Sequence, residues 1–260
     1  GETAIIEKSV NNIALYQSDS SDLICSNHYQ SDSFKTDQDN LQNIETTASN
    51  YRQLRTQELM NQYGALDYQE VAAILRDRGG LGGANIGLGN EKALNQLQGH
   101  HSVIFMPKER LMWVSTAPYQ LGEYVAYDLN SVFNQGTPSN KSVAVDSLLI
   151  EQDSFALTQE FKDYMEFRKL KKELKKITAN GTEYDKMDED KALRIVELNP
   201  NYYNAHEIAG NFFKAKLRYE EAIIHYKNAL EQEIATQAER QAIVKNLEEA
   251  KAENRKKNTN

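Results

Sequence analysis

Short apolar runs separated by polar turns fill the first part of the chain, a pattern typical of antiparallel strands. The first three runs are Ala4–Glu7, Ile13–Gln17 and Leu23–Ser26. Between them lie Asn11-Asn12 and the polar segment 18–22, and Asn, Asp and Ser are residues that favour turns. The pattern predicts a meander of three strands, followed by a loop over the polar residues 31–43.

Apolar residues then recur every three or four positions, which is the spacing of a helix that buries one side. Ser49–Gln62 is predicted as the first helix, and Gly64 follows as its end signal. Asp67 is suited to cap a second helix. The residues expected on the inner faces are Tyr51, Leu54, Leu59 and Tyr63 in the first helix and Val71, Ile74 and Leu75 in the second.

A glycine-rich loop over Gly79–Asn90 precedes three more predicted strands. These strands are Ser102–Met106, Leu111–Thr116 and Tyr124–Asp128. Strand patterning stops near Pro138–Lys141. We therefore expect one α+β domain over residues 1–140 and a linker over residues 141–154.

Residues 155–260 are predicted to form an all-α tail. The apolar side of its first helix follows a three-to-four spacing, over Phe161, Tyr164, Phe167 or Arg168, Leu170, Leu174 and Ile177. Asn180-Gly181 is expected to end this helix. Ala235–Lys251 is expected to form a final amphipathic helix that caps the tail.

Charge and composition exclude some classes of function. The net charge of −8 argues against a nucleic-acid partner, which would need a concentrated basic surface. No apolar run reaches the ~18 residues of a membrane span. The single cysteine, Cys25, permits no intrachain disulfide and gives no indication of cellular compartment. Thr3–Ser9 already has strand character with no start signal before it, so we expect the chain to begin inside a domain.

The stretch 203–236 has the length and the small/large pattern of one helical repeat. Its large positions are Phe213, Tyr219 and Tyr226, and its small ones are Gly210, Ala222 and Ala229. This stretch resembles a tetratricopeptide repeat, although His206 stands where that family prefers Trp. About three repeats are needed for a stable solenoid. Because only one repeat is clear, we expect antiparallel helices that pack against the first domain. A protein partner that binds the tail is a further expectation.

Six short motifs of the first domain carry a resemblance to a protein family through their order and spacing. They are Ile5-Ile6-Glu7, Leu23-Ile-Cys-Ser-Asn27-His28-Tyr29, Ala48-Ser49-Asn50-Tyr51-Arg52, Ser102-Val-Ile-Phe-Met-Pro107, Leu111-Met-Trp-Val-Ser115 and Tyr124-Val-Ala-Tyr-Asp128. Over residues 3–135 the chain resembles the C-terminal part of the penicillin acyltransferase-type family (acyl-CoA:6-aminopenicillanic acid acyltransferase-like), which are autoproteolytic N-terminal-nucleophile hydrolases. The resemblance implies part of an αββα sandwich.

In that family a cysteine freed at a new N-terminus attacks an amide or a thioester, with its own α-amine as base. The α-amine has a pKa near ~8 and can accept a proton at neutral pH. By resemblance, Asn27 would donate to the oxyanion and Arg52 would hold the substrate carbonyl or carboxylate. The alternatives are an asparagine that ends a strand, an arginine on a helix surface, and Ser49 as a simple helix N-cap.

Cys25 follows two apolar residues in a predicted strand and is interpreted as a small buried hydrophobe, not as the nucleophile. The nucleophile-bearing N-terminal segment is thus expected to be absent, and this chain alone to be inactive. No cofactor is expected: the glycine loop lacks the Gly-Lys-Ser/Thr ending of a phosphate-binding loop, and His100-His101 are interpreted as a polar strand entry. The alternative function is a non-catalytic binding module whose tail docks a partner.

Overall fold

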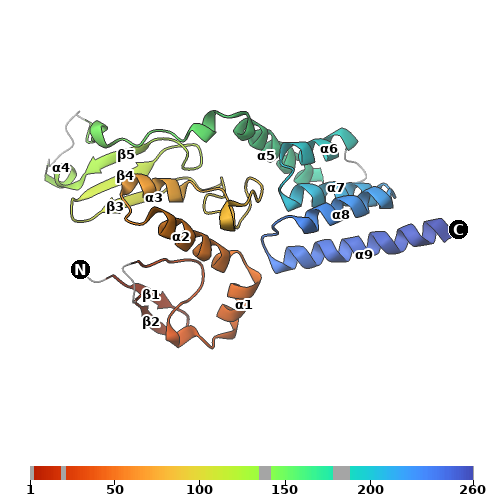
Figure 1. Ribbon diagram of the computed structural model, residues 1–260, viewed down its shortest axis with the longest axis horizontal. Helices are drawn as coiled ribbons and strands as arrows, with labels where there is room; N and C mark the ends of the chain where they lie inside the picture. Colours follow the sequence, from red (N-terminus) through yellow and green to blue (C-terminus); the bar gives the residue numbers. More distant parts are fainter. Residues whose placement is uncertain (1–2, 19–21, 135–141, 178–187, 260) are drawn as a thin grey trace.

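The computed structural model describes residues 3–18, 22–134, 142–177 and 188–259 (Figure 1). It is α+β, as the sequence predicts. One antiparallel sheet pairs β1 (Ile5–Lys8) with β2 (Ile13–Tyr16), and another has the order β3 (Val103–Met106), β4 (Leu111–Ser115), β5 (Tyr124–Asp128). The α-helices are α1 (Gln38–Thr46), α2 (Ser49–Tyr63), α3 (Tyr68–Leu75), α4 (Leu129–Asn134), α5 (Gln159–Ile177), α6 (Glu189–Leu198), α7 (Tyr203–Ala215), α8 (Tyr219–Glu231) and α9 (Gln237–Thr259).

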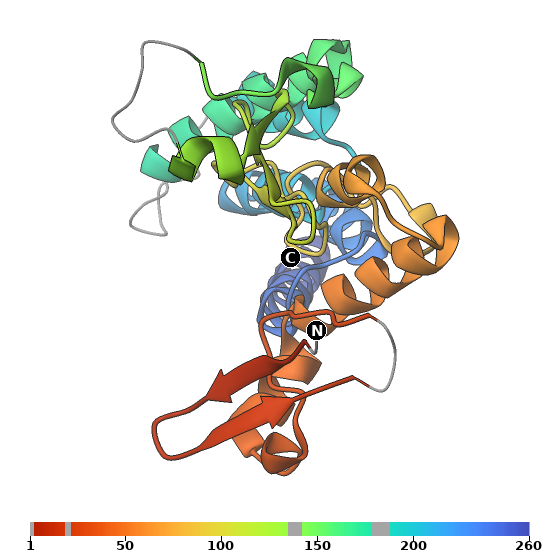
Figure 2. The same ribbon diagram turned by 90° about the vertical axis from the view of Figure 1, so that its left-hand side faces the viewer.

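The β1–β2 hairpin lies at one end of the molecule beside α1 (Figure 2). The third strand predicted over Leu23–Ser26 does not form. Side chains bind the backbone of this region instead of a neighbouring strand. The buried Asn40 accepts from the Tyr29 N–H at 2.9 Å and donates to the Tyr29 carbonyl at 3.0 Å. Within the predicted strand, the Ile24 carbonyl accepts from Gln30 Nε2 at 2.8 Å, so that a side chain takes the place of a strand partner there.

The loop predicted over residues 31–43 is also wrong, because it contains a 3-10 turn at Asp32–Phe34 and the start of α1. Asp37 caps α1 by accepting from the Asn40 N–H at 2.8 Å. The one buried residue of α1 is the polar Asn40, so the apolar periodicity that usually indicates a helix is weak here. Capping chemistry, which the sequence does show, is the signal that was missed.

The predictions for α2 and α3 are confirmed at their ends. α2 stops at Gly64, whose φ of 74° favours glycine, and Asp67 forms a full capping box with Glu70. The inner face of α2 was only partly predicted: Leu59 is buried, but Leu54 and Tyr63 are exposed. The helix instead buries Arg55, which forms a two-pronged ion pair with Asp77 through Nε–Oδ2 at 3.0 Å and Nη2–Oδ1 at 2.8 Å.

The three-stranded sheet is covered by α3 on one face. Trp113 is fully buried there, stacks on Tyr68 with ring centroids 4.6 Å apart, and donates from Nε1 to the Leu148 carbonyl at 2.8 Å. The opposite face is apolar and open. Its residues are Val103, Phe105, Met112, Val114 and Tyr127, continued by Phe133 of α4.

The predicted boundary at 138–141 lies outside the described residues, whereas residues 142–154 of the predicted linker are described. Ile150 pairs with Tyr124 through two backbone hydrogen bonds of 2.9 and 3.1 Å, and Ala144 forms a bridge with Tyr127. Asp153 forms an ion pair with Arg78 at 2.7 Å. This segment therefore lies along the β5 edge of the sheet.

The tail consists of α5 to α9, with α7, α8 and α9 side by side (Figure 1). Tyr203 at the start of α7 donates to Glu239 near the start of α9, and Lys214 at the end of α7 pairs with Glu249 further along α9. α7 and α9 therefore run in the same direction, with α8 antiparallel between them. The end signal predicted at Asn180-Gly181 lies outside the described residues.

The core of the tail continues into the first domain. Leu97 and Leu121 belong to the same buried cluster as the apolar residues of α5 to α9. The predicted inner residues of α5 are buried as far as Leu174, and Phe213 and Tyr226 are buried between helices while Tyr219 is half-buried. The expectation that the tail leans on the first domain is confirmed. Among the helices of the described part of the chain, none is both long and apolar enough to cross a membrane.

Candidate functional site

The two residues singled out from the sequence are in direct contact. Arg52 Nη2 donates to Asn27 Oδ1 at 2.5 Å, and the two residues are 25 positions apart in the chain. A guanidinium has donors only, so the amide of Asn27 must present its oxygen to Arg52. The amide nitrogen Nδ2 consequently points away, and it makes no hydrogen bond with any residue that the structure describes.

Arg52 is held at both ends of its guanidinium fork. Its Nη1 donates to the backbone carbonyl of Glu91 at 2.8 Å, in the segment that follows the glycine-rich loop. Burial lowers the pKa of Arg52, and the nearby Glu91 charge opposes this effect. The group remains a cation at any physiological pH because its ordinary pKa lies above 12. Arg52 is thus a positive charge held by two oriented bonds.

A second polar group lies next to Asn27. His28 Nδ1 is 2.8 Å from Ser49 Oγ, and Ser26 Oγ donates to the Ser49 carbonyl at 2.8 Å. Ser49 is therefore not the N-cap of α2, which was one expectation; Ala48 occupies that position, and Thr47 Oγ1 accepts from the Ser49 N–H at 3.2 Å. The Ser49 hydroxyl is used instead to tie the segment around Asn27 to the start of α2.

The pKa of His28 is lowered, and burial is the largest cause. Arg52 lowers it further, whereas a hydrogen bond with Gln53 and the charge of Glu7 raise it. A lowered pKa keeps the imidazole neutral at pH 7, so that its two nitrogens act as one donor and one acceptor. His28 is therefore a neutral hydrogen-bonding group beside Asn27.

Glu7 anchors the opposite side of this region. Its carboxylate accepts from the Gln30 N–H at 2.6 Å and the Ser31 N–H at 2.9 Å. Burial alone raises the pKa of Glu7, but the hydrogen bonds from Ser31 and Gln30 and the charge of His28 together bring it below its ordinary value. The charged carboxylate thereby fixes the backbone that follows Asn27.

A hollow of about 970 Å³ opens over this region. The residues that line it are Ile5, Ile6, Glu7, Lys8, Ser9, Val10, Cys25, Ser26, Asn27, His28, Tyr29, Asp37, Asp39, Asn40 and Asn43. Asn27 thus borders the hollow, while Arg52 stands behind it. Cys25 is exposed, so its interpretation as a buried hydrophobe is wrong. Without a strand at this position, nothing turns its side chain inward.

The sequence indicated Asn27 and Arg52 but not the supporting residues. His28 and Ser49 stand beside them in the motifs quoted above, so adjacency alone could have suggested these two. The role of Glu91 could not be found from the sequence, because it acts through its backbone carbonyl. In the described ranges no three His, Cys, Asp or Glu side chains are grouped to hold a metal ion.

Comparison with family models, with curated proteins and with solved structures finds no match to this chain. The function must therefore be argued from the site itself.

Proposed function

We propose that this chain is the part of a cysteine N-terminal-nucleophile acyltransferase or amidohydrolase that supplies the oxyanion donor, with a nucleophile contributed by a polypeptide segment outside these residues. One observation carries the proposal: Arg52 binds Asn27 Oδ1 at 2.5 Å and so leaves Nδ2 as the donor of Asn27, a residue that lines a hollow. The substrate class is a small acylated amide or thioester.

The chemistry requires such a donor. Attack on an amide or thioester carbonyl places negative charge on its oxygen, and a preorganised donor stabilises that charge by several kcal/mol. Arg52 prevents the amide of Asn27 from rotating, because a flipped amide would direct two N–H donors at a cation. The positive charge behind the amide also polarises it and makes Nδ2 a stronger donor toward a developing anion.

The bare face of the three-stranded sheet supports the proposed αββα arrangement. In that architecture each sheet has helices on one face and the second sheet on the other. Here α3 covers one face, while Phe105 and Phe133 on the other are 59% and 80% exposed beside an apolar hollow of about 550 Å³. A contiguous apolar surface of this kind is typical of an interface. The nucleophile-bearing segment is the proposed occupant.

The test uses the protein expressed from its complete reading frame, with whatever precedes Gly1. Intact mass and N-terminal sequencing should show a mature subunit that begins with cysteine, and a panel of acyl amides and thioesters should reveal turnover. Asn27→Ala should lower kcat by about 10²–10³ with the melting temperature unchanged. Asn61→Ala is the matched control, since Asn61 is an exposed asparagine on α2 whose side chain accepts a hydrogen bond from Gln57.

Two results would contradict the proposal. The first is a mature subunit that opens with a residue other than Cys, Ser or Thr. The second is an Asn27→Ala variant that folds and turns over substrate at the rate of the parent.

A non-catalytic binding module is the second candidate. The tail, which we propose to be tetratricopeptide-like, has a groove of about 550 Å³ between α5 and α6. Leu193 is partly exposed there among charged residues that include Glu166 and Arg194. This groove would be the docking site for a protein partner. A mature N-terminus without a nucleophile, together with a folded tail that binds a partner, would favour this candidate.

A further inference from the structure

The glycine-rich loop lies against the helical tail so closely that side chains would not fit at two positions. A Cβ on Gly87 would lie 2.5 Å from Tyr202 Cα, and one on Gly89 would lie 2.7 Å from the Tyr164 hydroxyl. Both glycines have φ near +80°, a conformation that other residues rarely adopt. The glycines at these two positions are therefore needed for contact with the tail as well as for the turn.

Between these two glycines the tail binds the backbone of the loop. Asn199 Oδ1 accepts from the Leu88 N–H at 3.1 Å, and Asn199 Nδ2 donates to the Leu88 carbonyl at 2.8 Å. One buried amide side chain thus satisfies both backbone groups of one residue, as a neighbouring strand would. Such a contact recognises the backbone of Leu88 and not its side chain.

The segment after the loop is tied to a second part of the tail, the connection between α8 and α9. Asn90 Nδ2 donates to the Glu233 carbonyl at 2.7 Å, and Lys92 pairs with the Glu233 carboxylate at 2.5 Å. Asn90 is completely buried. Four polar contacts from two separate tail positions, Asn199 and Glu233, therefore fix residues 88–92.

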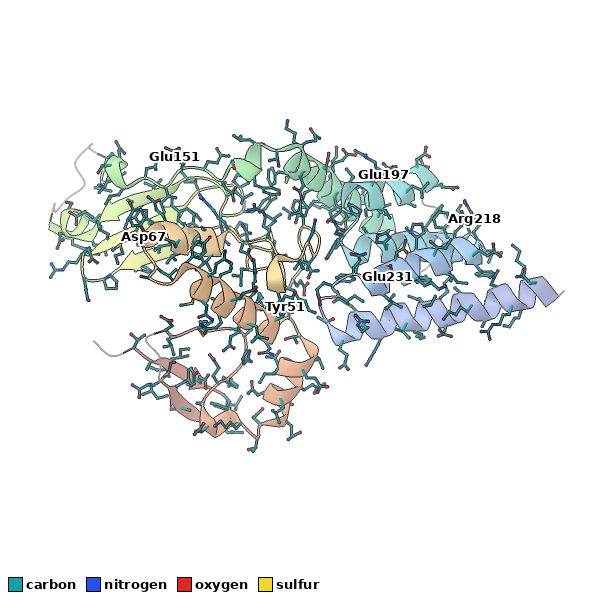
Figure 3. The ribbon with its side chains drawn as sticks, viewed as in Figure 1. Tyr51, Asp67, Glu151, Glu197, Arg218 and Glu231 are labelled. Carbon is teal, nitrogen blue, oxygen red and sulfur yellow. The ribbon has the colours of Figure 1, made fainter. Side chains whose placement is uncertain are left out.

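The other side of the same segment faces α2 and the candidate site. The Glu91 carbonyl accepts from Arg52 Nη1 at 2.8 Å, and Lys92 Nζ lies 4.7 Å from the ring centre of Tyr51, which is labelled in Figure 3. The Tyr51 hydroxyl accepts in turn from the Leu81 N–H at 2.9 Å. The loop segment is thus clamped between α2 and the tail.

We infer that the helical tail positions the Asn27–Arg52 pair by holding the glycine-rich loop, and that Asn199 is a positioning residue for that pair. The tail fixes Leu88, the chain carries that constraint to Glu91, and the Glu91 carbonyl orients the guanidinium of Arg52. The importance of this role for catalysis rests on the proposed function, whereas the structural coupling does not. The peptide that the tail recognises is, on this inference, a segment of its own chain.

The experiment measures the coupling in the 260-residue chain. Asn199→Ala should speed amide hydrogen exchange at Leu88 about tenfold, because the opening of that N–H no longer breaks a bond to Asn199. In ¹⁵N spectra the separate Nη signals of Arg52, assigned with Arg52→Lys, should merge as its bond to Glu91 loosens and the guanidinium rotates faster. Asn228→Ala, at a half-buried asparagine of α8, is the control and should change neither signal.

Glu233→Gln gives a second, milder variant that keeps the carbonyl bonded by Asn90 and removes only the charge that pairs with Lys92. It should move the Arg52 signals in the same direction by a smaller amount. Unchanged Arg52 signals in folded Asn199→Ala and Glu233→Gln would overturn the inference. Failure of the proposed function is distinguishable: the Arg52 signals would respond as expected, while the protein from the complete reading frame turned over no acyl substrate.

Discussion

Gly210 of α7 lies directly against the ring of Tyr226 of α8, so that a Cβ at Gly210 would be 2.7 Å from the Tyr226 ring. Tyr226 is fully buried, and its hydroxyl donates to Asn211 Oδ1 at 2.7 Å. The glycine lets the two helices approach, and the tyrosine fills the space between them. This pair determines how closely α7 and α8 pack.

Tyr226→Ala should lower the free energy of unfolding by about 3–5 kcal/mol, because it empties a large aromatic site in a closed core. Gly210→Ala should cost about 1–3 kcal/mol through overpacking, even though alanine is the better helix former. Urea unfolding of each variant measures both effects. Tyr63→Ala, at an exposed tyrosine of α2, is the control and should change stability by less than about 1 kcal/mol. A Gly210→Ala variant as stable as the parent would refute the close approach.

Asp77→Ala should destabilise the first domain by about 2–4 kcal/mol. The change leaves the Arg55 guanidinium buried with only Glu58 as a charged partner. The effect should exceed that of Glu253→Ala, which removes an exposed ion pair with Lys256 on α9 and should cost less than about 1 kcal/mol. Thermal and urea melts compare the two. Equal effects would show that burial does not strengthen the Arg55–Asp77 pair.

The tail should lose stability in acid because of His225. Burial, followed by the charge of His206, lowers the pKa of His225 to about 4, while Glu221 opposes the shift. Its ring stacks on Phe213 with centroids 5.2 Å apart. Between pH 6.5 and about 4 the unfolded chain binds a proton that the folded chain does not, so this contribution is complete above pH 6.5 and is lost as the pH falls toward 4.

A shift of this size corresponds to about 3 kcal/mol for a fully buried ring, and partial exposure reduces the expected loss to about 1–2 kcal/mol. His225→Phe keeps the stacking and removes the titration, so its stability should fall less than that of the parent between pH 7 and pH 4.5. His100→Gln, at an exposed histidine, should follow the parent. Parallel pH profiles for His225→Phe and the parent would contradict the role of this histidine.

Residues 150–260 expressed alone should not melt cooperatively near the temperature of the full chain. The tail core includes Leu97 and Leu121 of the first domain, and the separated tail would expose the surface that they cover. Circular dichroism during heating measures the transition. A sharp transition at the temperature of the intact chain would show that the tail folds independently of these contacts.

The 260-residue chain by itself should show no acyl transfer, and Cys25→Ala should leave that result unchanged. Cys25 is exposed, and the hydrogen bond from its Sγ goes to the neighbouring Ser26 carbonyl at 3.8 Å, not to a base. Turnover of amides or thioesters is the assay, with iodoacetamide labelling to confirm that the thiol is accessible. Turnover abolished by Cys25→Ala would make this residue the nucleophile after all.

Several elements are determined by local chemistry and can be predicted without tertiary contacts. The Asp67 cap with Glu70, the Gly64 end of α2 and the alternation of β3, β4 and β5 could all be predicted, because each depends on residues close in the chain. Gly210, a small position of the repeat pattern, is the place where α7 and α8 approach. The predicted strand at Leu23–Ser26 does not form, and its Ile24 carbonyl is bound by the side chain of Gln30, six positions further along the chain, instead of by a neighbouring strand.

The candidate site divides in the same way. The sequence by itself indicated Asn27 and Arg52 as candidate site residues, through the motifs around them. Only the tertiary structure decided that they touch, that Glu91 holds the other side of Arg52, and that Asn199 fixes the loop carrying Glu91. The physical reason is that these bonds join backbone and side-chain atoms 25 to 111 positions apart. A local sequence pattern does not predict contacts between residues so far apart in the chain. These contacts form only when the tail packs against the loop.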